Sequence, residues 1–529
     1  MEKRAKEINK KSLILWGALA GFAAILTMTV VMFVGRFKLG TPLIPELIAQ
    51  KLFSTVSPDL FNFFFFIFGE YAKYTAFAGA IALHLGIGTI LGILFVYLWK
   101  TVKFKNLMPF VFLYSISLWF VFSIVALPLL GFGFFGKYLS GEPVVGEIVL
   151  LTFYLLYGLI LYLFSLRLKS RVRKEGINRN EIEDSERRKF AGKLTSAFFA
   201  LSLGGLLFRK SPKRASAQTT SGTGDIFSKI KGLPPEVTPN EDFYVVSKNI
   251  FDPTVSVKNW ALRVEGLVEK PLKFKYEELK KLPSVEQYTT LICISNPVGG
   301  EFISNALWKG VALKTILEIA KPKNGAVDLV FYAFEDYSDS IPLDKALKEG
   351  TTLAYEINGK PLPDKHGFPL RLLVPGIYGE KNVKWITNIE LVNYDYKGFW
   401  QRRGWTDTAV IKTMSRIDVP KNGSTIRKED KYIGGIAFAG ERGINKVEVS
   451  LDEGRSWKQA HLKKAFPQSY TWTFWALEWD PAKEFPKGGD INIIARAADG
   501  EGNLQTYQIE PPAPDGSSGY HVIKVRLKV

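Results

Sequence analysis

The chain has 529 residues, a formal net charge of +18, 47% hydrophobic residues and a single cysteine. This length suggests three or four domains, and one thiol excludes an intramolecular disulfide framework and any multi-cysteine zinc or iron–sulfur site. The positive charge could indicate a nucleic-acid partner, so its distribution along the chain decides that question.

Long apolar runs lie almost entirely before residue 210. A hydrocarbon core about 30 Å thick requires roughly 20 apolar residues of helix. Residues 1–172 are therefore predicted to form an α-helical transmembrane bundle of four helices, at 13–35, 73–98, 108–131 and 144–166. The run Leu60–Phe68 is too short to span and is predicted to be an interfacial or re-entrant piece.

Lysine and arginine cluster at three places in this half: before residue 12, at 100–105 and at 167–174. The connections at 36–72 and 132–143 carry few basic residues for their length. The positive-inside rule places the N-terminus and the end of the fourth helix in the cytoplasm. Much of the net charge thus reflects membrane topology, and no nucleic-acid partner is expected.

The linker at 173–218 contains a pair of arginines, Arg187 and Arg188, followed by the apolar run 194–208 and an A-x-A triplet that ends at Ala217. These features resemble a twin-arginine export signal. The alternative is a fifth, short transmembrane helix at 194–208. Both interpretations predict a multi-pass protein of the cell membrane with everything after residue 218 on the extracytoplasmic side. They differ on cleavage after Ala217.

Short segments with Pro and Gly punctuation follow, and they predict a mixed α+β domain over 219–407. The expected strands are 261–268, 328–333 and 370–374, and the expected helices are 313–320 and 343–349.

Residues 408–529 are rich in short β-type segments separated by turns such as Asp452-Glu453-Gly454. Strands are expected at 434–438, 446–451, 471–479 and 491–497. Their number and spacing predict a compact β-sandwich of immunoglobulin type.

Cys293, in the segment LICISN, is the one thiol of the chain. A lone cysteine after an apolar strand is more often a small buried hydrophobe. The alternatives are a metal ligand or a nucleophile, and a nucleophile would be favoured by a nearby histidine. Composition alone does not choose among the three.

Several motifs in fixed order resemble the sulfite oxidase family. Cys293 in its LxCxxN context, YSDSIPL at 337–343, LAYEINGKPLPDKHGFPLRLLVPGIYG at 353–379 and NVKW at 382–385 are similar to its molybdenum-cofactor domain. GIAFAGERGINKVEVSLDEGRSW at 435–457 is similar to its immunoglobulin-like dimerisation domain. The resemblance covers about 235–529 and no part of 1–180.

This resemblance implies a molybdenum–molybdopterin cofactor, with the metal held by a pterin dithiolene and one protein thiolate. Cys293 matches the thiolate ligand, and a soft sulfur suits that metal. Tyr337 matches a phenol on the substrate side that could relay protons. The positions that match cofactor-binding residues of the family are Tyr244, Val245, Lys248, Asn249, His366, Arg371, Asn382, Val383 and Lys384.

The sequence departs from the family at the positions that bind sulfite. Sulfite oxidases follow the cysteine with Gly-Asn-Arg-Arg, whereas here Asn296 is followed by Pro297-Val298-Gly299-Gly300. Lys248 stands, with an altered spacing, where they have arginine. Lysine cannot reproduce the bidentate contacts of arginine to an oxyanion. Sulfite oxidation remains one interpretation, and a neutral or differently shaped small-molecule substrate is at least as well supported. A sulfoxide reductase of methionine-sulfoxide type is one example of an enzyme with such a substrate.

The predicted function is that of a membrane-associated, extracytoplasmic molybdenum oxidoreductase. Because His84 is alone in the predicted helices and a bis-histidine haem needs two, no haem is expected. Electrons would pass to a soluble carrier or a quinone, lipid would surround the helices, and a homodimer is possible through the C-terminal domain. The non-catalytic alternative is an extracytoplasmic binding module on a membrane anchor.

Overall fold

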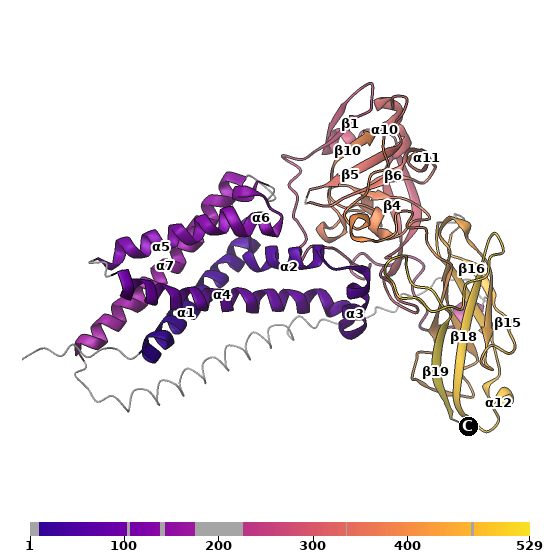
Figure 1. The fold of residues 1–529 in the computed structure, drawn as a ribbon. Coiled ribbons are helices and arrows are strands. Elements are labelled where there is room, and N and C mark those ends of the chain that lie inside the picture. Colours follow the sequence, from indigo (N-terminus) through magenta and orange to yellow (C-terminus); the bar gives the residue numbers. More distant parts are fainter. Residues whose placement is uncertain are drawn as a thin grey trace, which may run out of the picture. The chain divides into compact units, whose positions relative to one another are not determined.

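The computed structural model describes residues 10–102, 106–137, 143–174, 226–334, 336–466 and 470–528. The twin-arginine-like pair and the run 194–208 lie outside these ranges. The chain divides into two compact units, of which the first comprises Met1–Phe53 with Lys73–Arg214 and the second Ser54–Ala72 with Ala215–Val529 (Figure 1).

The first unit is helical. Four stretches are long and apolar enough to cross a membrane by length and composition: Leu13–Leu39, Ala72–Thr101, Leu107–Leu130 and Val144–Arg167. The prediction of four apolar helices is therefore confirmed, although the third has a π-helical stretch, Phe122–Ala126, within it. The elements are α1 (Lys10–Leu39), α2 (Ile44–Ser54), α4 (Ala72–Val102), α5 (Leu107–Val121), α6 (Leu127–Leu130) and α7 (Pro143–Lys174).

Close packing of α1 against α4 depends on small residues. A Cβ built on Gly92 would lie 2.3 Å from the Cα of Gly21, so these two positions leave no room for a larger side chain. Small residues at such crossings let two backbones approach closely in an apolar environment.

Helix α3 (Pro58–Phe68) belongs to the second unit. The hydroxyl of Ser57 caps it by accepting from the Leu60 N–H, and Pro58 occupies the first turn. The Asn62 side-chain amide forms hydrogen bonds of 2.7 and 3.1 Å with the backbone of Ala513, and the Phe61 ring lies 5.1 Å from that of Trp405. These contacts fix α3 to the second unit.

The α+β part of the second unit contains two five-stranded sheets, ordered β2-β1-β10-β5-β6 and β3-β4-β7-β8, with β9 added beside β7. Within the first of them, β1 and β10 run parallel and the other neighbours antiparallel. The strands are β1 (Ala261–Gly266), β2 (Leu272–Lys275), β3 (Ser284–Ile292), β4 (Ile303–Ala312), β5 (Asp328–Ala333), β6 (Ser338–Pro342), β7 (Thr352–Ile357), β8 (Lys360–Pro361), β9 (Arg371–Leu373) and β10 (Ile386–Val392).

Apolar side chains from both sheets and from three short helices share one core. Val264 and Phe331 of the first sheet, Val311 and Leu353 of the second and Ile316 are all buried in it. The helices are α9 (Tyr276–Leu279), α10 (Leu313–Ala320) and α11 (Leu343–Ala346).

All five elements expected in this part are present, and three are shorter than expected. The strand expected at 261–268 ends at Gly266, and the strand expected at 370–374 covers only Arg371–Leu373. The helix expected at 343–349 ends at Ala346, because the chain turns and reaches φ 86° at Gly350. Glycine adopts that conformation readily and a continuing helix cannot.

The C-terminal part is β-rich, as predicted. Its two sheets have the orders β11-β13-β17-β16 and β12-β19-β18-β14-β15, and buried Trp475, Val447 and Val525 share the core between them. Its elements are β11 (Met414–Val419), β12 (Thr425–Arg427), β13 (Tyr432–Phe438), β14 (Ile444–Ser450), β15 (Lys458–Gln459), β16 (His461–Lys464), β17 (Thr473–Glu478), α12 (Pro481–Glu484), β18 (Gly489–Asp499) and β19 (His521–Lys528).

This β-rich part braces β3, the strand that leads to Cys293. The Trp472 N–H donates to the hydroxyl of Thr290 at 3.0 Å, and the Thr290 N–H donates to the carbonyl of Tyr470 at 2.9 Å. Ile292 and Trp472 belong to one buried cluster. The position of the thiol is thus fixed from two directions, by the β3–β4 pairing and by the C-terminal part.

Candidate active site

Cys293 directly follows β3 and is buried, with 7% of its surface exposed. Its N–H donates to the Phe302 carbonyl at 2.9 Å, and its Sγ lies 2.9 Å from the hydroxyl of Ser295. Burial raises the pKa of the Cys293 thiol to about 11, against the hydrogen bond from Ser295. The thiol therefore stays protonated at neutral pH until a cation binds, and a bound metal deprotonates such a group.

The segment that contains Gly379 passes close to the backbone of Cys293. A Cβ built on Gly379 would lie 2.8 Å from the hydroxyl oxygen of Tyr244 and 3.8 Å from the Cα of Cys293. Burial raises the pKa of Tyr244, and the charge on Cys293 raises it further. Glycine at 379 thus brings Tyr244 and Cys293 together.

Arg371, at the start of β9, is a buried cation. Its two terminal nitrogens donate to the carbonyls of His366 at 3.1 Å and Asn382 at 3.4 Å, and its guanidinium lies 5.2 Å from the Trp308 ring centre. Burial lowers its pKa to about 10. Among the described residues no carboxylate pairs with it, and its Nε has no hydrogen-bond partner. Such a cation calls for an anionic ligand.

His366 is buried beside Arg371. Its Nε2 lies 3.1 Å from the carbonyl of Asn240, and its ring packs edge-on against Phe243 at 5.3 Å. Burial lowers the pKa of His366 to about 3, so the imidazole is neutral at physiological pH. A neutral imidazole beside a buried cation serves as a hydrogen-bonding group.

The segment 382–384 lines the same region with its backbone. The Asn382 side chain accepts from the Val374 N–H at 2.7 Å and donates to the Tyr378 carbonyl at 3.0 Å, so it supports the loop. Val383 is buried. The Lys384 ammonium donates to the Lys365 carbonyl at 3.1 Å.

Lys248 lies near Tyr337. Its ammonium forms an ion pair with Asp336 and donates to the Asn249 side chain at 2.9 Å, and it lies 5.4 Å from the Phe399 ring centre. Val245, three residues earlier, is 39% exposed. The positive charge of Lys248 is therefore paired with the Asp336 carboxylate.

Tyr337 immediately precedes β6. Its hydroxyl lies 2.7 Å from the Glu380 carbonyl oxygen and 3.2 Å from the Asp339 carboxylate. Burial raises the pKa of Tyr337, and Asp339, Glu380 and Cys293 add to the effect. The phenol therefore lies close enough to Cys293 to respond to its charge.

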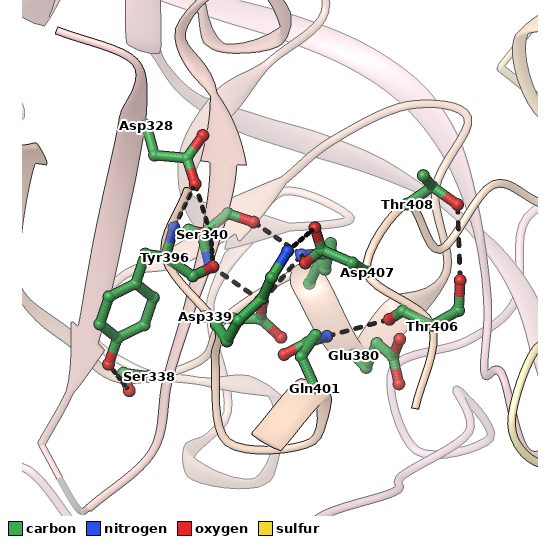
Figure 2. A network of polar contacts seen from close by, with 12 residues as sticks. Asp328, Ser338, Asp339, Ser340, Glu380, Tyr396, Gln401, Thr406, Asp407 and Thr408 are labelled. Atoms are coloured by element: carbon green, nitrogen blue, oxygen red, sulfur yellow. Dashed lines mark hydrogen bonds and ion pairs between the residues drawn. The ribbon is translucent and has the colours of Figure 1, made fainter. Parts of the chain in front are cut away.

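Three ionisable residues near Tyr337 were not among the predicted site residues: Asp339, Glu380 and Lys381. Figure 2 shows Asp339 and Glu380. The Lys381 ammonium lies 3.0 Å from the buried Asp339 carboxylate. Both carboxylate oxygens of Glu380 are buried without a hydrogen-bond partner among the described residues. The signal in the sequence was the presence of charged residues inside the motif segments YSDSIP and GIYGEKNVKW.

The segment after Cys293 carries no arginine and lines a small cleft. Asn296 orders it by accepting from the Phe302 N–H at 2.8 Å, and Gly299 adopts φ 73°. Tyr378 and Lys412 border the same cleft.

Two family models match this second unit. The oxidoreductase molybdopterin binding domain matches residues 250–400, and the Mo-co oxidoreductase dimerisation domain matches residues 406–510. Together with the buried thiol and the uncompensated guanidinium, these matches define a molybdenum-dependent oxidoreductase with a molybdopterin cofactor.

Similar proteins show to which family of molybdenum-dependent oxidoreductases the chain belongs. The chain is 31% identical over 322 residues to sulfite oxidase of Gallus gallus, covering 52% of this chain and 69% of that protein. It is 29% identical over 341 residues to mitochondrial sulfite oxidase of Drosophila melanogaster, covering 55% and 59%. An uncharacterized oxidoreductase of Bacillus subtilis is 33% identical over 173 residues, covering 33% and 85%. The chain belongs to the sulfite oxidase family.

Among solved structures, the sulfane dehydrogenase SoxCD from Paracoccus pantotrophus matches with a TM-score of 0.47 and 22% identity, covering 55% of this chain and 84% of that one.

The residues present fit the molybdopterin cofactor. Cys293 offers one soft ligand, and Arg371 offers an unpaired donor to an anion. No group of three or more His, Cys, Asp and Glu side chains positioned for a metal occurs in the described ranges. A metal held by one thiolate and by the cofactor's own sulfurs is compatible with this donor set.

Proposed function

We propose that this chain transfers an oxygen atom between a small-molecule substrate and water, as a membrane-associated molybdenum enzyme with an extracytoplasmic site. The observation that supports this most is a buried single thiol, Cys293, and a buried unpaired guanidinium, Arg371, around one tyrosine, Tyr244. When bound, the cofactor supplies a metal that exchanges two electrons with the substrate.

In this proposal each side chain has a defined task. Cys293 ligates the metal, and Tyr337 lies on the substrate side. Arg371 and the neutral imidazole of His366 bind the anionic and polar parts of the pterin. The remaining cofactor contacts are proposed for Tyr244, Val245, Lys248, Asn249, Asn382, Val383 and Lys384.

A neutral substrate is favoured over sulfite. The loop 297–300 offers no cation, and the Lys248 ammonium is paired with Asp336. In addition, burial raises the pKa of Glu380 well above its ordinary value, and this carboxyl group supplies no positive charge to hold an oxyanion. A sulfoxide reductase of methionine-sulfoxide type is the second candidate that these observations support.

Membrane association is supported by the four apolar helices and by α3. Phe63, Phe66 and Ile67 on α3 are all more than half exposed, and α4 begins only four residues after α3 ends. A transmembrane bundle at 1–172, an export signal or fifth helix at 173–218 and catalytic domains at 219–407 and 408–529 complete the proposed organisation. The two C-terminal sheets support an immunoglobulin-type sandwich, and the dimerisation-domain match supports a homodimer.

The electron partner is proposed to be a soluble carrier or a quinone. One observation in the helical unit favours a quinone. The imidazole of His84 is buried, and its Nε2 has no partner within the described part of the chain. Quinone carbonyls accept hydrogen bonds of the kind that such a ring nitrogen donates.

The test is metal content in the full-length chain, purified in detergent from a host that makes the cofactor. We expect about one molybdenum and one pterin per chain, and a thiolate-to-metal absorption band that Cys293→Ser removes. Ser295→Ala is the matched control, because it removes the hydrogen bond to the same sulfur but leaves the ligand, so the band should persist. A wild-type chain without molybdenum or pterin would support the binding-module alternative instead.

A further inference from the structure

A continuous set of polar contacts runs from Tyr337 to the surface. The Tyr337 hydroxyl lies 3.2 Å from one oxygen of Asp339, and the other oxygen of Asp339 lies 3.0 Å from the Lys381 ammonium. The same ammonium lies 3.4 Å from Asp407, whose second oxygen accepts from Lys397 at 2.7 Å. Figure 2 shows Asp339 and Asp407 lying close together, with dashed contacts converging between them.

The end of this set of contacts near Tyr337 is buried, and the other end is exposed to solvent. The side chains of Asp339 and Lys381 are 0% and 4% exposed, whereas those of Asp407 and Lys397 are 39% and 45% exposed. A buried ion pair is weak evidence for stability, since apolar residues of similar volume often serve as well. The buried ion pair of Asp339 and Lys381 lies between an active-site phenol and solvent, and this position suggests a functional role.

The chemistry in the proposed function requires proton movement, and the inference rests on it. Taking an oxygen atom from water releases two protons with the two electrons, and returning it to water consumes them. Because the site is buried, those protons need titratable groups that connect it with solvent. The requirement is the same for every substrate and for both reaction directions.

We propose that Asp339, Lys381 and Asp407 form a proton route between the hydroxyl of Tyr337 and solvent. In the outward direction Tyr337 takes a proton from the site while its own passes to Asp339. Lys381 then gives one proton to Asp407 as it takes one from Asp339, and Asp407 releases its proton to water. One proton enters and one leaves, every group returns to its first state, and the electrons leave separately to the carrier.

The charges around the route fit this order. Burial raises the pKa of Asp339, against the effect of Lys381, which makes this carboxylate a better acceptor for the phenol proton. Desolvation opposes the charge of Lys381, but Asp339, Asp407 and Glu380 outweigh it and raise the pKa of Lys381. Lys381 therefore hands its proton on only as it receives another. Asp395 and Arg402 face the outer end, at Lys397 and Tyr396.

The test measures proton release directly and needs no substrate. Full-length holoenzyme reduced beforehand is mixed with ferricyanide, and a pH-indicator dye and the metal absorption are followed together. We expect Asp407→Asn to slow proton release at least tenfold while molybdenum content stays unchanged, and imidazole buffer to restore the rate. The matched control is Asp395→Asn, which also removes a carboxylate from Lys397 but does not contact Lys381.

A second variant provides the same test if single substitutions at Asp339 or Lys381 unfold the chain. Asp339→Asn with Lys381→Gln removes both buried charges together, which is tolerated far better than removal of one. It should slow proton release as much as Asp407→Asn does, without rescue by imidazole. Equal release rates in wild type and both variants would overturn the route, whereas absence of molybdenum would instead refute the proposed function.

Discussion

Arg371 is a buried cation whose guanidinium contacts backbone carbonyls and an indole ring but no carboxylate among the described residues. Burial without a counter-ion costs stability, as the lowered pKa of Arg371, about 10, indicates. An anionic ligand would offset that cost, which is the physical basis for assigning this residue to the cofactor.

The variant Arg371→Met should separate folding from cofactor binding. Because it removes an uncompensated buried charge, we expect the cofactor-free chain to melt at the same temperature or higher. Molybdenum and pterin content should fall at least tenfold, as measured by metal analysis and pterin fluorescence. Arg402→Met, at a more exposed cation, is the control and should retain full content. Retained content in Arg371→Met would contradict the assignment.

Glu380 is a second buried ionisable residue whose side chain has no hydrogen-bond partner among the described residues. Burial raises the pKa of Glu380 well above its ordinary value of 4.5, and nearby Asp339 adds to the rise. Because the folded-state pKa is the higher one, this group's contribution to stability is complete below about pH 4.5 and is lost as the pH rises through the folded-state value.

The variant Glu380→Gln should remove this pH dependence. Compared with the wild type, its free energy of unfolding should fall less as the pH is raised from about 4.5, with a difference of at most about 1.4 kcal/mol per pH unit. Thermal unfolding of the cofactor-free chain over a pH series measures it. The exposed Glu429→Gln is the control, and identical pH profiles for Glu380→Gln and wild type would show that Glu380 titrates normally.

At the scale of elements, the short turn Gly379–Lys381 holds three parts of the site together. It lies close to the backbone of Cys293, accepts a hydrogen bond from the Tyr337 hydroxyl at the Glu380 carbonyl and supplies the Lys381 ammonium that pairs with Asp339. The absence of a side chain at Gly379 permits this approach, since Tyr244 is only 2.8 Å from where a Cβ would lie.

A methyl group at Gly379 should therefore disturb the site. We expect Gly379→Ala to lose about 1–3 kcal/mol of stability through overpacking and to bind less molybdenum. The double variant Gly379→Ala with Tyr244→Phe removes the nearest atom, the phenolic oxygen, and should recover most of the stability in thermal unfolding. If the double variant is no more stable than the single one, the contact with Tyr244 is not the cause.

At the scale of the whole molecule, the proposed topology places the second unit outside the cytoplasm. A reporter enzyme that is active only outside the cytoplasm, fused after Val529, should be active, and the same reporter fused in the basic connection at 100–105 should be inactive. The expectation for 100–105 follows from the distribution of lysine and arginine beside the apolar helices, and the expectation for Val529 follows from the export signal or fifth helix proposed for 173–218. Reversed activities would contradict the topology, and activity at both positions would contradict the cytoplasmic placement of the 100–105 connection.

The sequence predicted what depends on neighbouring residues and on composition. Apolar runs of helical length marked the four helices, and punctuated segments marked strands such as Asp328–Ala333, which the structure has at the same limits. The motifs around Cys293 and HGFPLR identified the cofactor domain and its candidate ligands, because such motifs keep their residues at fixed spacing.

Only the tertiary structure decided which groups meet. Lys381 and Asp339 lie 42 positions apart, and Asp407 a further 26 beyond Lys381, so no local pattern joins them. Nor does a pattern show that Arg371 is unpaired or that Glu380 is buried, because burial depends on how β6, β9 and the 378–381 turn pack together. The chain by itself therefore determined its elements, its family and one thiol, while the packing of distant segments decided the charges that surround that thiol.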